Sequence, residues 1–305
     1  MATHSDSQLA AAITHAASLQ TFYTIRYLVD RNLVDDAYRA YAYFRWVDDW
    51  LDEEDHPPQR RLEFVQRQQA LIEDGYRGRQ LAGYTPEEGL LVDLIRGDTG
   101  ENSGLQAYIR NMMAVMAFDA DRRGRLISQR ELNDYTHWLA VAVTEAMHYF
   151  IGHCCASPQG ELRYQAVTGA HITHILRDAL EDVQAGYYNI PREILAAHGS
   201  SPTGIESRAY REWAMKSVRQ ARACFKAGRE YLSGVESWRC RIAGYAYIHR
   251  FEIVLNCIEL ENFSLREQYL ERKSARCTLE TLGWAAWMAL HYRRSVPASS
   301  VLSLR

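Results

Sequence analysis

The sequence predicts an all-α fold, and three observations support that prediction. Apolar residues recur at intervals of three and four along almost the whole 305-residue chain, which is the period of an amphipathic helix. The alternation of β-branched and polar residues that is typical of strands is rare. Only 7 prolines and 18 glycines interrupt the pattern, so few positions break a helix.

The N-terminal part of the chain is expected to form three helices, over residues 6–30, 34–50 and 59–75. The first has apolar residues at helical spacing, namely Leu9, Ile13, Ala16, Phe22, Ile25 and Leu28. The second ends in an acidic segment before Pro57 and Pro58, because two adjacent prolines cannot continue a helix.

Helix-start signals place the elements that follow. Thr85 is a capping residue for a helix whose first residue is Pro86, and residues 105–119 form an apolar, methionine-rich helix. Ser128 and Glu131 form a capping box at the start of the next helix. Further helices are expected over residues 165–183, 207–232, 236–260 and 276–292.

The composition excludes several classes of protein. A formal charge of −3 and the lack of a basic tract give no electrostatic basis for binding nucleic acid. Six cysteines are scattered without a C-x-x-C motif, which argues against a disulfide framework and a zinc site and fits a reducing compartment. The N-terminus has no basic segment leading into an apolar core, so no signal peptide is predicted. We therefore expect a cytoplasmic protein with one domain spanning residues 1–305.

No apolar run is long enough to cross a bilayer. The most membrane-like segment is Leu282–Leu290, which is followed by Arg293 and Arg294. A buried C-terminal helix is the favoured interpretation of this segment. Peripheral contact with a membrane is the alternative.

The segment Tyr41–Asp52 carries the first motif with chemical meaning. Asp48 and Asp52 are four residues apart in an otherwise apolar run, so on a helix their side chains share one face. Tyr41 and Arg45 extend the same face by two further turns.

The segment His171–Asp182 repeats this pattern. Asp178 and Asp182 are again four residues apart in an apolar, helix-compatible run, and His171 and His174 extend their face. The chain therefore has two aspartate pairs on two separate predicted helices.

Four carboxylates in apolar helices need a partner, because burying an unpaired carboxylate is costly. Mg²⁺ is a suitable partner, since it prefers oxygen ligands and completes its shell with water and substrate phosphates. Two such faces opposed across a cavity would hold Mg²⁺ ions against a diphosphate. The alternative is two solvated acidic faces paired with Arg or Lys, and the repetition of the motif favours the metal site.

These segments resemble the two signatures of the squalene/phytoene synthases, the head-to-head branch of the trans-isoprenyl diphosphate synthases. The matching residues are Tyr41, Arg45, Asp48, Asp49 and Asp52 in the first, and Ile175–Asp178, Glu181, Asp182, Gly186 and Ile190–Pro191 in the second. The resemblance spans roughly residues 18–280. It implies a class I terpenoid synthase fold, a helical bundle around a central cavity, and Mg²⁺-dependent diphosphate chemistry.

The resemblance also implies a role for each group of residues. The metal ligands would be Asp48, Asp52, Asp178, Asp182 and His174, with Tyr41 and Arg45 as further catalytic residues. Diphosphate would be bound by Thr21, Arg45, Arg177, His171 and His174. The dry pocket that a carbocation needs would be walled by Phe22, Tyr43, Leu139, Val143, Met147 and Tyr245. Taken singly, Arg45 could form a surface ion pair, and any wall residue could be plain core.

The chain departs from the family pattern at two places. His171 and His174 stand where the family usually has Gln and Asn, and the Asn is on the metal side. Val141 and Thr144 stand in a helix that bears glycine in the family, so side chains are added where substrate would pass. These departures concern the acceptor pocket and the product more than the ionisation of diphosphate.

The leading prediction is a Mg²⁺-dependent prenyltransferase that condenses two prenyl diphosphates, farnesyl or geranylgeranyl, head to head and releases diphosphate. No G-x-G-x-x-G motif is present, so the sequence gives no support for a reductive step with NADPH. A second hypothesis is that a single prenyl diphosphate is cyclised, hydrolysed or transferred to a non-prenyl acceptor. A third is a non-catalytic relative used for binding or assembly, against which the four intact aspartates argue.

Overall fold

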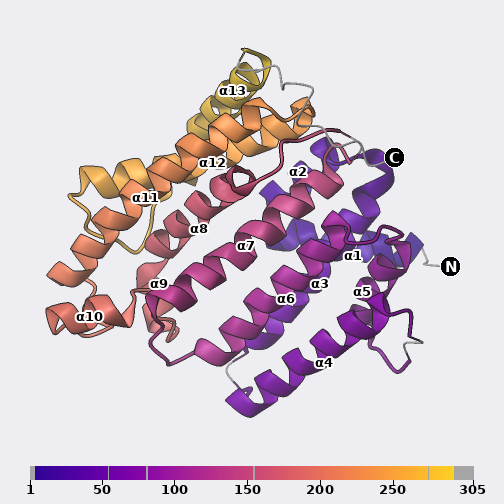
Figure 1. Ribbon diagram of the computed structural model, residues 1–305, viewed down its shortest axis with the longest axis horizontal. Coiled ribbons are helices and arrows are strands. Elements are labelled where there is room, and N and C mark those ends of the chain that lie inside the picture. The colour runs from indigo at the N-terminus through magenta and orange to yellow at the C-terminus, as the bar shows by residue number, and fades with distance from the viewer. Residues whose placement is uncertain (1–3, 54, 80–81, 154, 274, 292–305) are drawn as a thin grey trace. The chain divides into compact units, whose positions relative to one another are not determined.

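The computed structural model describes residues 4–53, 55–79, 82–153, 155–273 and 275–291, and the regular elements of these segments are helices (Figure 1). The one β-type contact in this part of the chain is an isolated parallel bridge between Leu126 and Tyr188. The all-α prediction is confirmed. Residue contacts divide the chain into two compact units, of which the first comprises residues 1–121 and 141–153 and the second residues 122–140 and 154–305.

Unit 1 contains the N-terminal helices and the second half of α7. Its elements are α1 (His4–Ala17), α2 (Leu19–Leu28), η1 (Arg31–Leu33), α3 (Val34–Asp52), α4 (Pro58–Tyr76), α5 (Pro86–Gly97), α6 (Gly104–Arg122) and the end of α7 (Gln129–Phe150). The helix expected over residues 6–30 is in fact two helices. Ser18 separates them, because its hydroxyl accepts from the backbone N–H of Thr21 at 3.2 Å and caps α2.

The buried face of α3 forms the centre of unit 1. Tyr43 is fully buried, and its hydroxyl donates to Oε1 of Gln68 on α4 at 3.0 Å. The Gln68 amide in turn donates to Glu88 on α5 at 2.8 Å, and Arg67 donates to both oxygens of Glu88 at 2.7 Å. Burial alone would raise the pKa of Glu88, but these hydrogen bonds outweigh it and hold the pKa below its ordinary value. The buried face of α3 is thereby fixed against α4 and α5.

Unit 2 contains the first half of α7 and the C-terminal helices. Its further elements are η2 (Glu161–Tyr164), α8 (Gln165–Arg177), α9 (Ala179–Gln184), α10 (Arg192–His198), α11 (Arg208–Ser233), α12 (Trp238–Leu260), η3 (Leu270–Lys273) and α13 (Ala275–His291). The capping box expected at Ser128 and Glu131 is present, since each side chain bonds the backbone N–H of the other residue. The short helix α10 was not expected from the sequence.

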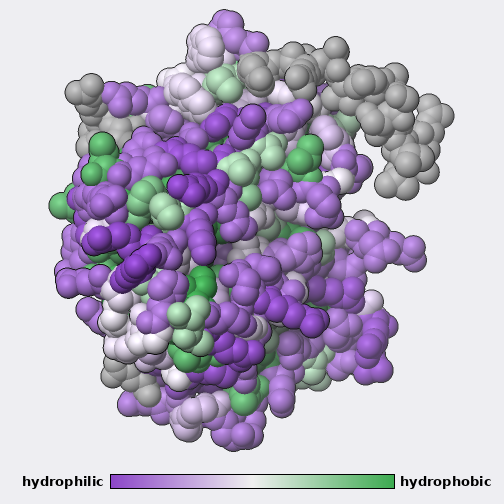
Figure 2. Space-filling view, turned by 60° about the vertical axis from the view of Figure 1, so that its left-hand side comes forward, coloured by the Kyte–Doolittle hydropathy of each residue, from purple (hydrophilic) through white to green (hydrophobic). Residues whose placement is uncertain are grey.

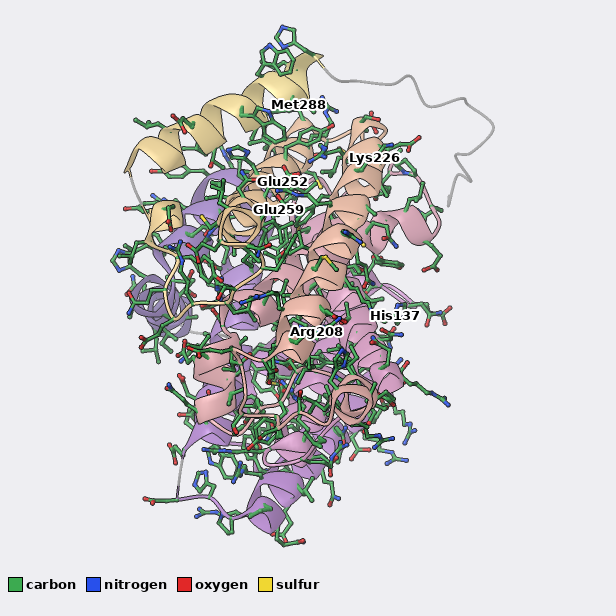
Figure 3. All side chains as sticks on the ribbon, turned by 90° about the vertical axis from the view of Figure 1, so that its left-hand side faces the viewer. His137, Arg208, Lys226, Glu252, Glu259 and Met288 are labelled. Carbon is green, nitrogen blue, oxygen red and sulfur yellow. The ribbon has the colours of Figure 1, made fainter. Side chains whose placement is uncertain are left out.

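Helix α8 is the central element of unit 2 and packs against α11 and α12. Glycines allow the close approach of α8 to α11. A Cβ atom on Gly169 would lie 2.9 Å from the ring of Phe225, and one on Gly228 would lie 2.8 Å from Cβ of Ala166. Helix α11 is also joined to α12, because Arg222 and Arg229 form ion pairs with Glu259 and Glu252 at 2.7 and 2.8 Å. Figure 3 labels the two glutamates on α12. These contacts fix the position of α8.

Helix α13 is buried on one face only. Ala285 and Ala289 are buried, and the guanidinium of Arg241 donates to the carbonyl of Ala289 at 2.9 and 3.1 Å. Its other face is exposed at Leu279, Leu282, Trp287 and Leu290. The expected burial of this helix is therefore wrong for the face that carries these four residues.

None of the helices in the described segments is long and apolar enough to cross a membrane. Figure 2 shows a face of the molecule on which hydrophilic side chains predominate and hydrophobic ones form small, separate patches.

Candidate active site

One face of α3 gathers the residues of the first aspartate motif. Arg45 donates from Nη1 to Oδ2 of Asp48 at 3.3 Å and from Nη2 to Asp49 in a short ion pair. Both aspartates are partly exposed, whereas Val47 on the opposite face is fully buried. The packing of α3 thus turns this face outward from the core of unit 1.

The carboxylate of Asp48 lies in a strongly negative environment. Partial burial and the neighbouring charges of Asp52 and Asp119 raise its pKa to about 6, although Arg45 acts in the opposite direction. Asp119 near the end of α6 was not predicted as a site residue. The only sequence signal for it was the pair of aspartates at 119 and 121 that ends an apolar helix. A bound cation would relieve the repulsion among these carboxylates.

Replacing Asp48 with Asn is expected to raise the thermal midpoint of the metal-free protein above about pH 6. Because folding raises the pKa of Asp48, ionisation of this group destabilises the folded state, and the loss grows as pH rises from about 4 to about 6. The increase in thermal midpoint that Asn gives should therefore become smaller as pH falls from about 6 to about 4. Thermal unfolding in EDTA at several pH values measures it, and a lower midpoint for Asp48→Asn at pH 7.5 would contradict the electrostatic interpretation.

A cluster of hydroxyl groups lies beside the first motif. The Ser18 and Thr21 hydroxyls are 2.9 Å apart, and both bond the Tyr41 side chain. Burial raises the pKa of Tyr41, while Arg45 and these two hydroxyls act against the rise. The structure thus brings the predicted Thr21, Tyr41 and Arg45 together in unit 1, and it adds Ser18.

The second motif lies at a break between two helices. The helix expected over residues 165–183 ends at Arg177, and Asp178 separates α8 from α9. Arg177 donates to both carboxylate oxygens of Asp178, and Nε2 of His174 lies 2.7 Å from Oδ2. Burial alone would raise the pKa of Asp178, but the bonds from Arg177 and His174 hold it well below its ordinary value. Asp178 is therefore ionised at any physiological pH.

His174 contacts the second motif through one ring nitrogen. Nε2 must carry a proton in order to donate to the Asp178 carboxylate, so this nitrogen has no lone pair for a metal ion. In this arrangement Nε2 holds the carboxylate, and in a neutral ring Nδ1 is the nitrogen that keeps a lone pair. The predicted role of His174 as a metal ligand therefore stays a prediction that only Nδ1 can fulfil.

His171 is a buried, neutral imidazole whose tautomer follows from its partner. The Thr136 hydroxyl donates its proton to the Leu132 carbonyl at 2.8 Å, so it can only accept from Nδ1 of His171 at 3.1 Å. Burial, with the charges of His174 and Arg122, lowers the pKa of His171 to about 3. Nδ1 is therefore the protonated nitrogen and Nε2 carries a lone pair. The predicted donation from His171 to a diphosphate does not fit this tautomer.

The predicted pocket residues have different environments. Tyr43 is corrected to a core residue of unit 1, because it lies on the buried face of α3 and its hydroxyl bonds Gln68. Phe22 is partly buried and stacks on Tyr38 with ring centroids 5.6 Å apart. Tyr245 is fully buried in unit 2 and meets Trp284 edge to face. Leu139, Val143 and Met147 are partly buried on α7.

The chain matches the model of the squalene/phytoene synthase family over residues 16–277. It belongs to this family. Among curated proteins it is similar to a phytoene synthase of Thermus thermophilus, with 28% identity over 238 residues, which cover 75% of this chain and 76% of that protein. Family membership supports a squalene/phytoene synthase-like prenyltransferase in general terms.

Solved structures confirm the fold of this family member. A dehydrosqualene synthase in complex with a ligand has a TM-score of 0.70 at 15% identity, over 94% of this chain and 98% of the other. The squalene synthase HpnC from Alicyclobacillus acidocaldarius has a TM-score of 0.66 at 18% identity, over 86% and 96% of the two chains. The predicted helical isoprenoid synthase fold is therefore confirmed.

Proposed function

We propose that the protein is a Mg²⁺-dependent prenyltransferase that condenses two prenyl diphosphates of farnesyl or geranylgeranyl length head to head and releases diphosphate. The observation that carries the proposal is the cluster of like charges around Asp48, whose pKa is raised to about 6. Such a cluster is costly unless a cation binds to it. The family match supplies the type of reaction.

The donor atoms of both motifs fit Mg²⁺. Carboxylate oxygens are the ligands that this ion prefers, and Asp178 is ionised at any physiological pH. Within the described segments, no group of three or more His, Cys, Asp or Glu side chains is arranged so that it could hold a metal ion. Mg²⁺ would therefore need further ligands from water and substrate phosphate, which this ion commonly uses.

Asp48 and Asp52 in unit 1, and Asp178 and Asp182 in unit 2, would be ligands for Mg²⁺, and bound Mg²⁺ would neutralise the diphosphate so that it can leave. Around the motifs, the chain itself supplies hydrogen-bond donors. Arg45 can contact a phosphate oxygen with its planar fork, and the hydroxyls of Tyr41 and Thr21 lie on the same side of unit 1. Arg177 donates to Asp178 from Nε and Nη2, and its Nη1 takes no part in these two hydrogen bonds.

Incubation of the purified protein with farnesyl or geranylgeranyl diphosphate and Mg²⁺, with and without NADPH, tests the proposal by product mass. We expect a product with twice the carbon number of the substrate, and its degree of reduction shows whether NADPH is used. An alcohol or cyclic hydrocarbon with the carbon number of the substrate would replace this function by hydrolysis or cyclisation of a single prenyl diphosphate.

One observation favours that second candidate function. Thr144 on α7 is buried, and its hydroxyl has no hydrogen-bond partner among the described residues. A buried hydroxyl without a partner can hold a water molecule, and water is the reactant that quenches a carbocation to an alcohol.

Replacing Thr144 with Val is expected to stabilise the protein by about 1 kcal/mol, because it removes an unpaired buried hydroxyl and keeps the shape of the side chain. The fraction of alcohol among the products should fall as well. Thr136→Val is the matched control, since the Thr136 hydroxyl bonds Leu132 and His171, and this variant is expected to be destabilised. Equal losses of stability in both variants would show that the Thr144 hydroxyl is satisfied in the folded protein.

A further inference from the structure

A single asparagine joins the last aspartate of the second motif to a buried arginine. Nδ2 of Asn189 donates to Oδ2 of Asp182 at 2.7 Å, and Nη1 of Arg122 donates to Oδ1 of Asn189 at 2.8 Å. Asn189 is 4% exposed and Arg122 is 5% exposed. All three residues belong to unit 2, although Arg122 lies 67 positions before Asn189 in the chain.

The direction of these hydrogen bonds is set by the chemistry of the two end groups. A guanidinium can only donate, and an ionised carboxylate can only accept. The amide of Asn189 must therefore turn its oxygen to Arg122 and its nitrogen to Asp182. The amide can have only one orientation, and the carboxylate is held in turn by that amide.

Arg122 is itself held firmly. Its guanidinium lies over the rings of Tyr135 and Tyr187, at 4.8 and 4.9 Å from their centroids. The segments that carry Arg122 and Asn189 are also joined through their backbones, because Gly124 donates to the Gly186 carbonyl at 2.8 Å and Leu126 bridges Tyr188. Both glycines have positive φ, which makes this tight crossing possible.

We propose that Asn189 and Arg122 are positioning residues that orient the Asp182 carboxylate for Mg²⁺, an inference that rests on the proposed function. A hydrogen bond to one oxygen fixes the rotation of the carboxylate and thereby the direction in which its other oxygen points. Metal affinity depends on such outer hydrogen bonds, and losing one typically lowers it about 10–100-fold. The hydrogen-bonded series from Arg122 through Asn189 to Asp182 needs both Arg122 and Asn189, because the position of the Asn189 amide depends on the Arg122 guanidinium.

The test is the affinity for Mn²⁺, a spectroscopic substitute for Mg²⁺, measured by electron paramagnetic resonance in the presence of inorganic diphosphate. For Asn189→Leu we expect binding weaker by about 10–100-fold. The Mg²⁺ concentration for half-maximal activity should rise by a similar factor, while kcat at saturating Mg²⁺ stays within a few-fold of wild type. A purely structural role would instead lower the thermal midpoint and leave the Mn²⁺ affinity of the folded protein unchanged.

Asn256→Leu is the control for the loss of an Arg–Asn pair, because exposed Asn256 accepts from Arg222 at 2.5 Å in the same unit, and Arg222 belongs to neither motif. The Mn²⁺ affinity of this control variant should equal that of wild type.

Arg122→Lys keeps the positive charge but loses the planar guanidinium and its contacts with the two tyrosine rings, so it should weaken Mn²⁺ binding less than Asn189→Leu. If Asn189→Leu does not fold, the Mn²⁺ affinity of Arg122→Lys is the test of the inference. Unchanged Mn²⁺ affinity in a folded variant would overturn the inference. Absence of Mn²⁺ binding by the wild type with diphosphate would overturn the proposed function itself.

Discussion

The Asp178→Asn variant is expected to lose at least about 10³-fold in kcat/KM with a prenyl diphosphate. Asp178 carries a full negative charge at neutral pH, because Arg177 and His174 hold its pKa well below the ordinary value. The amide keeps the shape but not the charge, so the proposed metal site loses an anionic ligand. Metal stabilisation of a leaving group contributes several kcal/mol, and each 1.36 kcal/mol corresponds to about tenfold in rate.

Glu181→Gln is the matched control for this prediction. Glu181 is an exposed carboxylate three residues further along, on α9. Its neutralisation should change kcat/KM less than about threefold, because surface charges contribute little. Steady-state kinetics at saturating Mg²⁺ distinguishes the two variants. Equal activity of both would show that Asp178 has no special part in the reaction.

The Gly228→Ala variant is expected to lose about 3 kcal/mol of unfolding free energy, since the added methyl group overpacks a closely packed helix pair. Its Cβ would lie 2.8 Å from Cβ and 2.9 Å from Cα of Ala166, so α11 and α8 would have to separate. Because α8 ends beside Asp178, the activity should fall with the stability. Urea unfolding followed by circular dichroism measures the effect.

Gly283→Ala is the corresponding control on another helix. Apart from the neighbouring backbone of α13, no atom of the described residues lies within 4 Å of a Cβ built at Gly283, so the substitution adds helix propensity without a clash among them. It should stabilise the protein by about 0.5–1 kcal/mol. If the unfolding free energy lost in Gly228→Ala is no larger than the change in Gly283→Ala, then α8 and α11 can separate to admit the methyl group without a loss of stability.

The helices and the two aspartate pairs could be predicted because their signals are local. The spacing of Asp48 and Asp52, the prolines after α3 and the capping box at Ser128 are all read within a few residues. The breaks at Ser18 and Asp178 were missed because the apolar period continues across both. At Ser18, a hydroxyl that bonds the local backbone competes with the helix and ends it.

The partners of the site residues could not be predicted, because they depend on tertiary packing. Arg122 reaches Asn189 from a distant segment, and Asp119 reaches the neighbourhood of Asp48 from α6. The roles of His171 and His174 depend on which nitrogen carries the proton. Only the positions of Thr136 and Asp178 in space decide that.

Release of diphosphate from farnesyl diphosphate, with and without Mg²⁺, is the measurement that tests the central claim most directly. Wild-type protein should release diphosphate only when Mg²⁺ is present, and the Asp48→Asn, Asp178→Asn double variant should release none under the same conditions. Release without Mg²⁺, or release by a folded double variant at the wild-type rate, would contradict a mechanism in which the two aspartate motifs bind the metal that ionises the substrate.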